Sequence, residues 1–515
     1  MTQSPDTTRA PREFQRRSGE LNDLLCVLNL LTWDARTQMP PGGGVTRAQQ
    51  LATLSALARE RALDPAFEQA AQEARSDPAQ TAAAAQALEA VRAMRRVPEA
   101  LTRELALLKS EAQATWAEAR ANSDFAAFAP ALTRMVGLNR ALADALGYED
   151  HPYDALLNLY EPGLTGAALE PLFAQLRSHH VALLRRIQAR PAPRTDFLRR
   201  HYPAAVQREL CLSAAQTFGY DLARGRLDES AHPFEISLTR QDVRITTRIQ
   251  EHFLSGALFG TLHETGHALY EQGVSPDLTR TVLASDLLGL YAVGGSSYGT
   301  HESQSRLWEN RIGRSQAYWA LHYPALQARF PEQLGDVAAD DFHRAVNEVR
   351  PSLIRVEADE LTYDLHIMLR VELERALIGG ELEVAELPDA WNARMKADLG
   401  LDVPDDRQGV LQDIHWSSGL FGSFPTYTIG NVMASQFYGA AAQALPDLGA
   451  QLARGDYAPL REWLTTQIYQ YGRTFTPHEL LVRTTGRGLD PVPYLDYLSD
   501  KYSALYGLTP QDAQV

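Results

Sequence analysis

The strongest chemical signal in the sequence is the segment His263-Glu264-Thr265-Gly266-His267. The residues from Leu254 to Tyr270 have the apolar spacing of a helix, and Gly273 is a suitable C-terminal stop. Two histidines four positions apart lie on one helix face, so both imidazoles can bind one zinc ion. Glu264 is placed to take a proton from an attacking water as a general base. Gly266, which weakens a helix interior, indicates that something packs closely there.

A catalytic zinc ion needs a third protein ligand and one open position. Glu271 lies on the same helix face but a full turn beyond His267, too far along to share the ion easily. A second helix that begins near residue 301 is the better source of the third ligand. By spacing alone, His301, Glu302 and Glu309 are all candidates, and any one of them could instead be a solvated helical charge.

The elements that must position these residues are predicted to be mostly helices. Over residues 13–145 apolar residues recur at three- and four-residue steps, and the helical pattern returns toward the C-terminus. Thr165 is placed to cap a further helix. Apolar residues alternate over 234–238 and again over 243–247, which predicts a strand pair. The predicted fold class is therefore mainly α, with a small antiparallel β-sheet beside the metal-binding helix.

Composition places the chain among folded proteins with a substantial core. The 515 residues are 45% hydrophobic, and 49 Lys+Arg against 64 Asp+Glu give a net charge of −15, which argues against nucleic-acid binding. No stretch approaches the about 20 apolar residues of a membrane span, and residues 1–11 lack the apolar core of a secretory signal. Cys26 and Cys211 lie in unrelated contexts and are interpreted as small hydrophobic residues. These features predict a cytoplasmic protein without nucleic-acid or membrane partners.

A series of short motifs along nearly the whole chain resembles the M32 family of metallocarboxypeptidases, the carboxypeptidase Taq type. In that family the His-Glu-Ser-Gln segment, here at 301–304, is a hallmark and its glutamate is the third zinc ligand, so the resemblance assigns this role to Glu302. The stretch from His267 to His301 departs from the family pattern by its greater length, with 287–295 as the extra part. The other matching motifs are Trp33-Asp34, Met39-Pro40-Pro41-Gly42-Gly43, Tyr160-Glu161-Pro162-Gly163, His232-Pro233-Phe234, Asp242-Val243-Arg244-Ile245-Thr246, Arg355-Val356-Glu357-Ala358-Asp359 and Gly409-Val410-Leu411-Gln412-Asp413-Ile414-His415-Trp416.

The resemblance also implies an architecture. It implies one large helical peptidase unit over residues 13–515 with a deep central groove, and the sequence predicts a disordered tail over residues 1–12. Within the unit, residues 13–165 are expected to cover the groove and residues 166–515 to form the catalytic part. A homodimer is implied as well. The family further implies one zinc ion per chain, which cobalt can replace, and broad specificity that disfavours a C-terminal proline.

An enzyme that acts at a peptide C-terminus must recognise a free carboxylate, which the planar fork of arginine suits. The motifs supply Arg244 and Arg355 as candidates for substrate binding. Each could instead form a structural ion pair, Arg244 with Asp242 and Arg355 with an acidic residue of its own motif. His232, which precedes a proline in an extended segment, either contacts the substrate terminus or fixes the strand.

A developing oxyanion needs a hydrogen-bond donor besides the metal ion. His415 and Tyr427 lie in the stretch 412–431, whose several glycines predict an irregular backbone of the kind that often carries function. We expect both to stabilise the oxyanion, although each could instead be a buried structural residue. Asp359 and Asp413 are candidates to orient a ligand or a catalytic histidine, and the sequence does not choose between them.

The sequence therefore predicts a zinc-dependent carboxypeptidase that hydrolyses single amino acids from peptide C-termini. His263, His267 and Glu302 are the expected ligands, and Glu264 is the expected base. Another zinc peptidase, either an aminopeptidase or a short-peptide endopeptidase, would use the same metal triad and differ in what recognises the substrate end. A catalytically silent helical scaffold is disfavoured, because such a protein has no chemical reason to keep Glu264.

Overall fold

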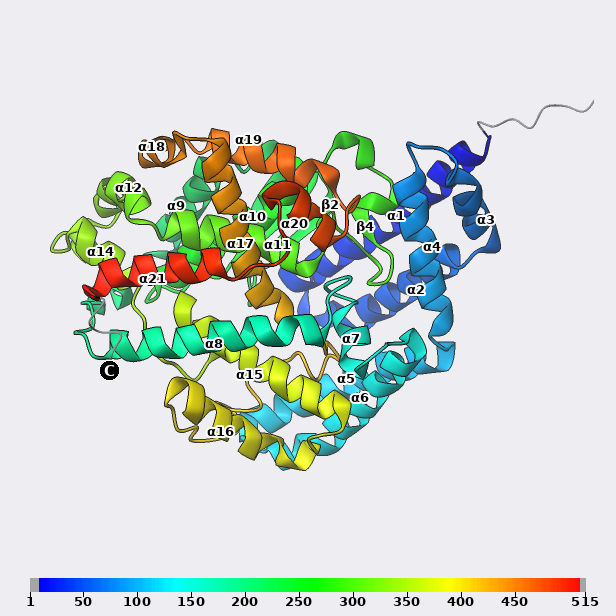
Figure 1. The fold of residues 1–515 in the computed structure, drawn as a ribbon, viewed down its shortest axis with the longest axis horizontal. Coiled ribbons are helices and arrows are strands. Elements are labelled where there is room, and N and C mark those ends of the chain that lie inside the picture. Colours follow the sequence, from blue (N-terminus) through cyan, green and yellow to red (C-terminus); the bar gives the residue numbers. More distant parts are fainter. Residues whose placement is uncertain (1–8, 510–515) are drawn as a thin grey trace, which may run out of the picture. The chain divides into compact units, whose positions relative to one another are not determined.

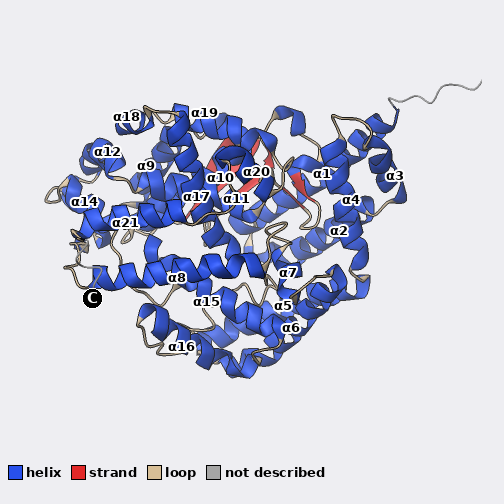
Figure 2. Cartoon of the chain, in the orientation of Figure 1, coloured by secondary structure: helices blue, strands red, loops and turns tan. Residues whose placement is uncertain are grey.

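Helices account for most of the residues that the computed structural model describes, residues 9–509 (Figures 1 and 2). The mainly α fold class predicted from periodicity is confirmed. Residues 1–8 of the predicted tail lie outside the described residues, whereas Arg9 already begins the first helix. None of the described helices is long and apolar enough to cross a bilayer.

The chain divides into two compact units, each built from three separate segments. Unit 1 comprises Met1–Arg95, Thr195–Phe342 and Phe437–Gly486, and unit 2 comprises Arg96–Arg194, His343–Gln436 and Arg487–Val515. Both units draw residues from either side of position 165. Helices α14 (Ala339–Val346) and α17 (Pro425–Ala444) contain residues of both units.

Unit 1 holds both sheets of the described chain and the helices packed around them. Its helices are α1 (Arg9–Thr37), α2 (Gly44–Ala62), α3 (Pro65–Ala74), α4 (Thr81–Arg96), α9 (Ala204–Phe218), α10 (Leu254–Gly273), α11 (Tyr298–Arg306), α12 (Gln316–Arg329), α13 (Pro331–Leu334), α18 (Leu448–Ala453), α19 (Ala458–Gln467) and α20 (Pro477–Thr485). Its strands are β1 (Gly225–Glu229), β2 (Glu235–Thr239), β3 (Asp242–Thr247), β4 (Ser285–Asp286) and β5 (Tyr291–Ala292). β4 and β5 form a short antiparallel pair within the connection from α10 to α11.

The larger sheet has the strand order β1-β3-β2. β2 and β3 pair antiparallel, with Glu235 opposite Ile245, which confirms the strand pair predicted from alternation. β1 adds a parallel strand on the other side of β3, with Leu227 opposite Ile245, so the sheet is mixed rather than purely antiparallel. Val243 and Ile245 are buried in one cluster with Ala268 of α10, so the sheet packs against this helix as predicted.

The close packing predicted at Gly266 is present. A Cβ atom at this position would lie 2.5 Å from the Gln304 carbonyl oxygen and 2.6 Å from the Ser305 Cα atom, both in the backbone of α11. Helices α10 and α11 therefore approach each other to backbone contact, which only glycine permits here. This contact brings together the two helices that carry the predicted metal ligands.

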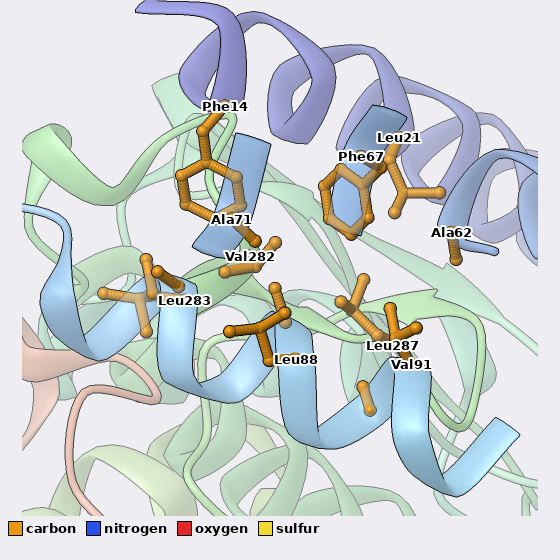
Figure 3. Close-up of a cluster of buried hydrophobic side chains, with 14 of the residues drawn as sticks. Phe14, Leu21, Ala62, Phe67, Ala71, Leu88, Val91, Val282, Leu283 and Leu287 are labelled. Carbon is orange, nitrogen blue, oxygen red and sulfur yellow. The ribbon is translucent and has the colours of Figure 1, made fainter. Parts of the chain in front are cut away.

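A hydrophobic cluster fixes α1 and the connection between α10 and α11 in unit 1. Figure 3 shows Phe14 and Leu21 of α1 and Phe67 of α3 in this cluster, together with Val282 and Leu287 of the connection. Leu88 and Val91 of α4 belong to the same cluster. The cluster thus anchors the N-terminal helix against the segment that leads into α11.

Among its described residues, unit 2 contains helices and irregular segments but no strand. Its helices are α5 (Glu99–Asn122), α6 (Phe125–Leu146), α7 (Pro152–Leu157), α8 (Gly166–Gln188), α15 (Glu360–Gly379), α16 (Leu387–Leu399) and α21 (Val492–Tyr506). Thr165 caps α8 by accepting a hydrogen bond from the Ala168 N–H, as predicted. The buried Asp364 carboxylate of α15 accepts hydrogen bonds from Tyr494 of α21 and Thr428 of α17, both at 2.7 Å, and so ties these helices together.

Candidate metal centre and active site

Three side chains from two helices of unit 1 converge at one point. His263 and His267 of α10 and Glu302 of α11 place their ligand atoms within 4.8 Å of one another. Glu302 Oε2 lies 3.5 Å from His263 Nε2 and 3.3 Å from His267 Nε2. Two imidazole nitrogens and one carboxylate oxygen are a donor set of catalytic zinc sites, so these residues fit a single divalent ion.

Charged neighbours hold two of these side chains in place. The His263 Nδ1–H donates to Glu309 Oε2 at 3.0 Å, which leaves Nε2 as the lone-pair atom that faces the centre. Glu309 in turn accepts a hydrogen bond from Arg314 at 3.0 Å, and Glu302 Oε1 accepts one from Arg306 at 2.7 Å. Glu309, a ligand candidate by spacing, therefore positions His263.

His301, the other ligand candidate by spacing, lies behind His267. The two rings are stacked with centroids 4.5 Å apart and an interplanar angle of 14°. His301 Nε2 forms a hydrogen bond of 3.0 Å with Glu271 Oε1, and Glu271 also accepts hydrogen bonds from the backbone N–H groups of Gly294 and Gly295. Glu302 therefore lies beside both histidines, whereas His301 stacks on the ring of His267.

Glu264 is buried beside this centre, with 6% of its surface exposed. The pKa of its carboxyl group is raised to about 7, mainly by burial; the nearby His263 opposes this shift and the Glu302 carboxylate adds to it. A carboxyl group with a pKa near the working pH can both accept and return a proton. Its environment therefore suits the role of general base.

Several of the predicted residues of unit 2 form a polar cluster around Asp413. The Asp413 carboxylate accepts a hydrogen bond from Arg355 Nη2 at 2.7 Å and one from Arg370 Nε at 2.6 Å. Arg355 Nη1 also donates to the Tyr363 hydroxyl at 2.9 Å. Burial opposes ionisation of Asp413, but the two guanidinium groups hold its pKa well below the usual range. Arg355 therefore pairs with Asp413 rather than with an acidic residue of its own motif.

His415 and Tyr427 lie next to each other in unit 2. The His415 Nε2 atom is 3.4 Å from the Tyr427 hydroxyl, and the His415 Nδ1 atom is 3.8 Å from Asp413 Oδ1, beyond hydrogen-bond distance. Burial lowers the pKa of His415 to about 4, so the ring is neutral at pH 7. A neutral imidazole and a phenol can both donate hydrogen bonds, as the sequence interpretation requires. Asp359 instead caps α15 by accepting hydrogen bonds from two of its N–H groups.

Of the remaining candidates in unit 1, Arg244 lies on β3 and His232 lies in the connection between β1 and β2. Arg244 forms two hydrogen bonds of 2.8 Å with the Asp242 carboxylate, and its guanidinium lies 4.2 Å from the centroid of the Trp33 ring. His232 is exposed. Sequence reasoning overlooked Arg36, whose guanidinium lies 3.9 Å from the centroid of the Phe234 ring. The available signal was its position in the motif segment that begins with Trp33.

Comparison with known proteins gives a consistent result over nearly the whole chain. A model of the carboxypeptidase Taq (M32) metallopeptidases matches residues 13–502. "Thermostable carboxypeptidase 1" of Thermus thermophilus is 44% identical, covering 96% of this chain and 98% of the relative. "Carboxypeptidase 1" of Bacillus subtilis is 39% identical, covering 93% and 95%.

The fold of the chain is also similar to solved structures. The crystal structure of an M32 carboxypeptidase from Deinococcus radiodurans R1 matches with a TM-score of 0.93 and 41% identity, covering 96% of this chain and 99% of that one. A Pyrococcus furiosus carboxypeptidase structure matches with a TM-score of 0.91 and 34% identity, again covering 96% and 99%. The motifs, the fold and the extent of these matches agree, and the chain therefore belongs to the carboxypeptidase Taq (M32) family of metallopeptidases.

Proposed function

We propose that this protein is a zinc-dependent carboxypeptidase that hydrolyses single amino acids from the C-termini of peptides. The observation that carries the proposal is the convergence of His263, His267 and Glu302 beside the buried Glu264. The donor set and the adjacent carboxylate are those of a metal-assisted hydrolase. Membership of a family whose relatives are named carboxypeptidases supports the choice of substrate end.

In this proposal Glu264 performs the proton transfers. A zinc ion held by His263, His267 and Glu302 would supply Lewis-acid chemistry, which polarises the scissile carbonyl and makes water more acidic. The Glu264 carboxylate accepts the proton of the attacking water and then returns it to the departing amine. Glu309 keeps His263 in the tautomer with the proton on Nδ1, because its carboxylate accepts a hydrogen bond from the Nδ1–H group. The Nε2 atom therefore remains available to the metal ion.

The other proposed roles rest on the motifs and on the local geometry of each candidate. His415 and Tyr427 are proposed as donors to the oxyanion, supported by the neutral state of the imidazole. Arg355, Arg244 and His232 are proposed to bind the substrate terminus. Both arginines already donate to a carboxylate, so in this role they bind substrate while retaining their Asp partners.

Several finer properties follow from the family resemblance. We propose broad specificity with C-terminal proline disfavoured, replacement of zinc by cobalt, a homodimer and a cytoplasmic location. The alternatives are another zinc peptidase with the same metal triad, or a silent scaffold. The other peptidases differ from a carboxypeptidase in the peptide end that they require, and the scaffold differs in having no turnover. An assay that compares peptides with free and blocked ends therefore separates them.

The test is amino-acid release from one N-blocked peptide with either a free or an amidated C-terminus. Each form is incubated with the zinc- or cobalt-loaded protein, with and without chelator. We expect stepwise, metal-dependent release from the free C-terminus only. In Glu264→Gln we expect kcat to fall by about 10²–10⁴-fold because the general base is lost.

The controls separate loss of the base from other damage. Glu462→Gln changes an exposed glutamate on α19 of the same unit and should retain wild-type kcat. Metal content of Glu264→Gln should stay at one ion per chain. Equal cleavage of the amidated peptide would favour the endopeptidase, release only from an unblocked N-terminus would favour the aminopeptidase, and metal binding without any cleavage would favour the scaffold.

A further inference from the structure

Arg36 is an accessible cation in the last turn of α1, in unit 1. The acidic residue nearest to it in sequence, Asp34, forms an ion pair of 2.7 Å with Arg47. Within residues 9–509, no aspartate or glutamate forms an ion pair with Arg36. An arginine that has an aromatic support but no carboxylate partner is available to bind an anionic ligand.

Phe234 fixes this guanidinium in one place. The Arg36 Cζ atom lies 3.9 Å from the centroid of the Phe234 ring, and the ring is buried. The backbone on either side of that ring is held by Thr246 of β3, because the Phe234 N–H donates to Thr246 Oγ1 and the Phe234 carbonyl accepts from the Thr246 N–H, both at 2.9 Å. A cation–π contact uses the face of the guanidinium, so the N–H groups at its edge remain available as donors.

The same segment connects Arg36 to the helix of the metal ligands. Pro233 lies next to α10, since a Cβ atom on Gly260 would be 3.8 Å from its ring. Gly260 precedes Glu264 by four residues, one turn earlier on the same helix face. The charges of Arg36 and Glu264 also act on each other: Glu264 raises the pKa of Arg36 against the larger effect of burial, which lowers it. Through Phe234 and its neighbour Pro233, Arg36 is therefore linked to the turn of α10 that precedes the base.

We infer that Arg36 binds a carboxylate group of the peptide substrate and so helps to position the peptide for hydrolysis. The inference rests on the proposed peptidase function and adds a substrate-binding residue to it. Its chemical basis is the contrast with the other candidates, because the forks of Arg244 and Arg355 are already bonded to Asp242 and Asp413. Arg36 has no such partner among the described residues, so its whole fork is available for a new bidentate pair.

Two substrate groups carry this chemistry. One is the C-terminal carboxylate, which is common to all substrates of a carboxypeptidase. The other is an acidic side chain near the scissile bond, which is present only in some peptides. If Arg36 had only a structural role, it would bind neither group and would only complement the partial negative charge at the C-terminal end of α1.

The test uses the full-length, metal-loaded protein with Arg36→Gln, Arg36→Lys and the control Arg226→Gln. Arg226 also lies over an aromatic ring, 5.0 Å from the centroid of Trp33, but it is paired with Asp228 at 2.6 Å. The three substrates are N-blocked dipeptides. One has alanine at both positions, one has glutamate at the C-terminal position, and one has glutamate at the position before it. We expect Arg36→Gln to lower kcat/KM at least tenfold, mainly through KM, with Arg36→Lys intermediate and Arg226→Gln within twofold of wild type.

The pattern over substrates identifies the group that binds. An equal loss on all three dipeptides assigns the C-terminal carboxylate, and a loss confined to the glutamate peptides assigns the side chain. Unchanged KM values on all three dipeptides would overturn the inference. A variant Arg36→Gln that differs from wild type only by a lower melting temperature would overturn it as well. Calorimetric binding of the same dipeptides to Glu264→Gln, with and without Arg36→Gln, tests the inference without turnover, so that failure of the proposed activity remains distinguishable.

Discussion

The side chains of both candidate clusters are fixed by other charges rather than by packing alone. Glu302 is held by Arg306, His263 by Glu309, and Asp413 by two arginines in unit 2. A buried charge retains its ionised state only while such partners remain. Each cluster therefore depends on supporting charges, among them Arg306 and Glu309 in unit 1 and Arg370 in unit 2, that have no proposed contact with metal or substrate.

Asp413→Asn should destabilise the protein by about 3–5 kcal/mol at neutral pH, because the buried charges of Arg355 and Arg370 then lose their shared counter-charge. The pKa of Asp413 is depressed in the folded state, so its contribution is present above the unfolded pKa near 3.8 and is lost as the pH falls below it. Thermal unfolding measured from pH 7 to pH 3 should show a gap between wild type and variant that narrows below about pH 4. Asp496→Asn, at an exposed position, is the control, and a gap independent of pH would contradict the assignment.

Local spacing placed His263, Glu264 and His267 on one helix, as the structure does on α10, because a single helix fixes the relative directions of its side chains. It could not choose among His301, Glu302 and Glu309, since that choice depends on which face α11 turns toward α10. The partner of Arg355 was equally hidden, because Asp413 lies far along the chain and only the fold of unit 2 brings them together. Local pairs such as Arg244 and Asp242, two residues apart on one strand, were foreseeable.

At the scale of elements, the metal centre depends on how α11 is placed against α10. A π-helix over Leu307–Gly313 directly follows α11 and carries Glu309 in its first turn. The wider turn of a π-helix changes the direction of side chains relative to a continued α-helix, and such turns are frequent at functional sites. Neither this turn nor strand β1 was predicted, because β1 has the sequence Gly-Arg-Leu-Asp-Glu without apolar alternation.

Gly266→Ala should destabilise unit 1 although alanine is the better helix former. The new Cβ atom would meet the backbone of α11 at 2.5 Å, and the resulting displacement should cost about 1–3 kcal/mol. Because α11 carries Glu302, metal affinity should fall as well. Gly439→Ala on α17 is the matched control, since nothing lies within 4 Å of its Cβ position and the gain in helix propensity should raise stability by up to about 1 kcal/mol. A higher melting temperature for Gly266→Ala would show that the two helices separate easily.

At the scale of the whole molecule, each unit is assembled from three stretches of chain that are far apart in sequence. Composition and periodicity predicted a helical protein but did not predict that the segments of the two units alternate along the chain. The spacing of apolar residues indicates the type of a single element, but it does not indicate which other elements that element packs against. All three proposed metal ligands lie in the central stretch of unit 1, whereas α1, which carries Arg36, belongs to its first stretch.

Metal binding should stabilise the folded protein by mass action. With zinc at about 1,000 times its dissociation constant, the gain is about 4 kcal/mol, which should appear as a higher melting temperature. Differential scanning calorimetry of metal-free and zinc-loaded protein measures this shift. His267→Ala removes one ligand and should abolish most of it, whereas His322→Ala, on α12 of the same unit, should preserve it. An equal shift in all three proteins would place the stabilising ion elsewhere.

The order in which the stretches of unit 1 leave the ribosome has a consequence for biosynthesis. Residues up to Glu302 are made early, but unit 1 also needs Phe437–Gly486, and the middle stretch of unit 2 is synthesised in between. Because N-terminal parts of a chain begin to fold first, the nascent protein presents two histidines and a glutamate before their surroundings are finished. A chain that stops before Phe437 would therefore carry all three proposed ligands without the last stretch of unit 1, and would expose them to the divalent ions of the cell before the unit is complete.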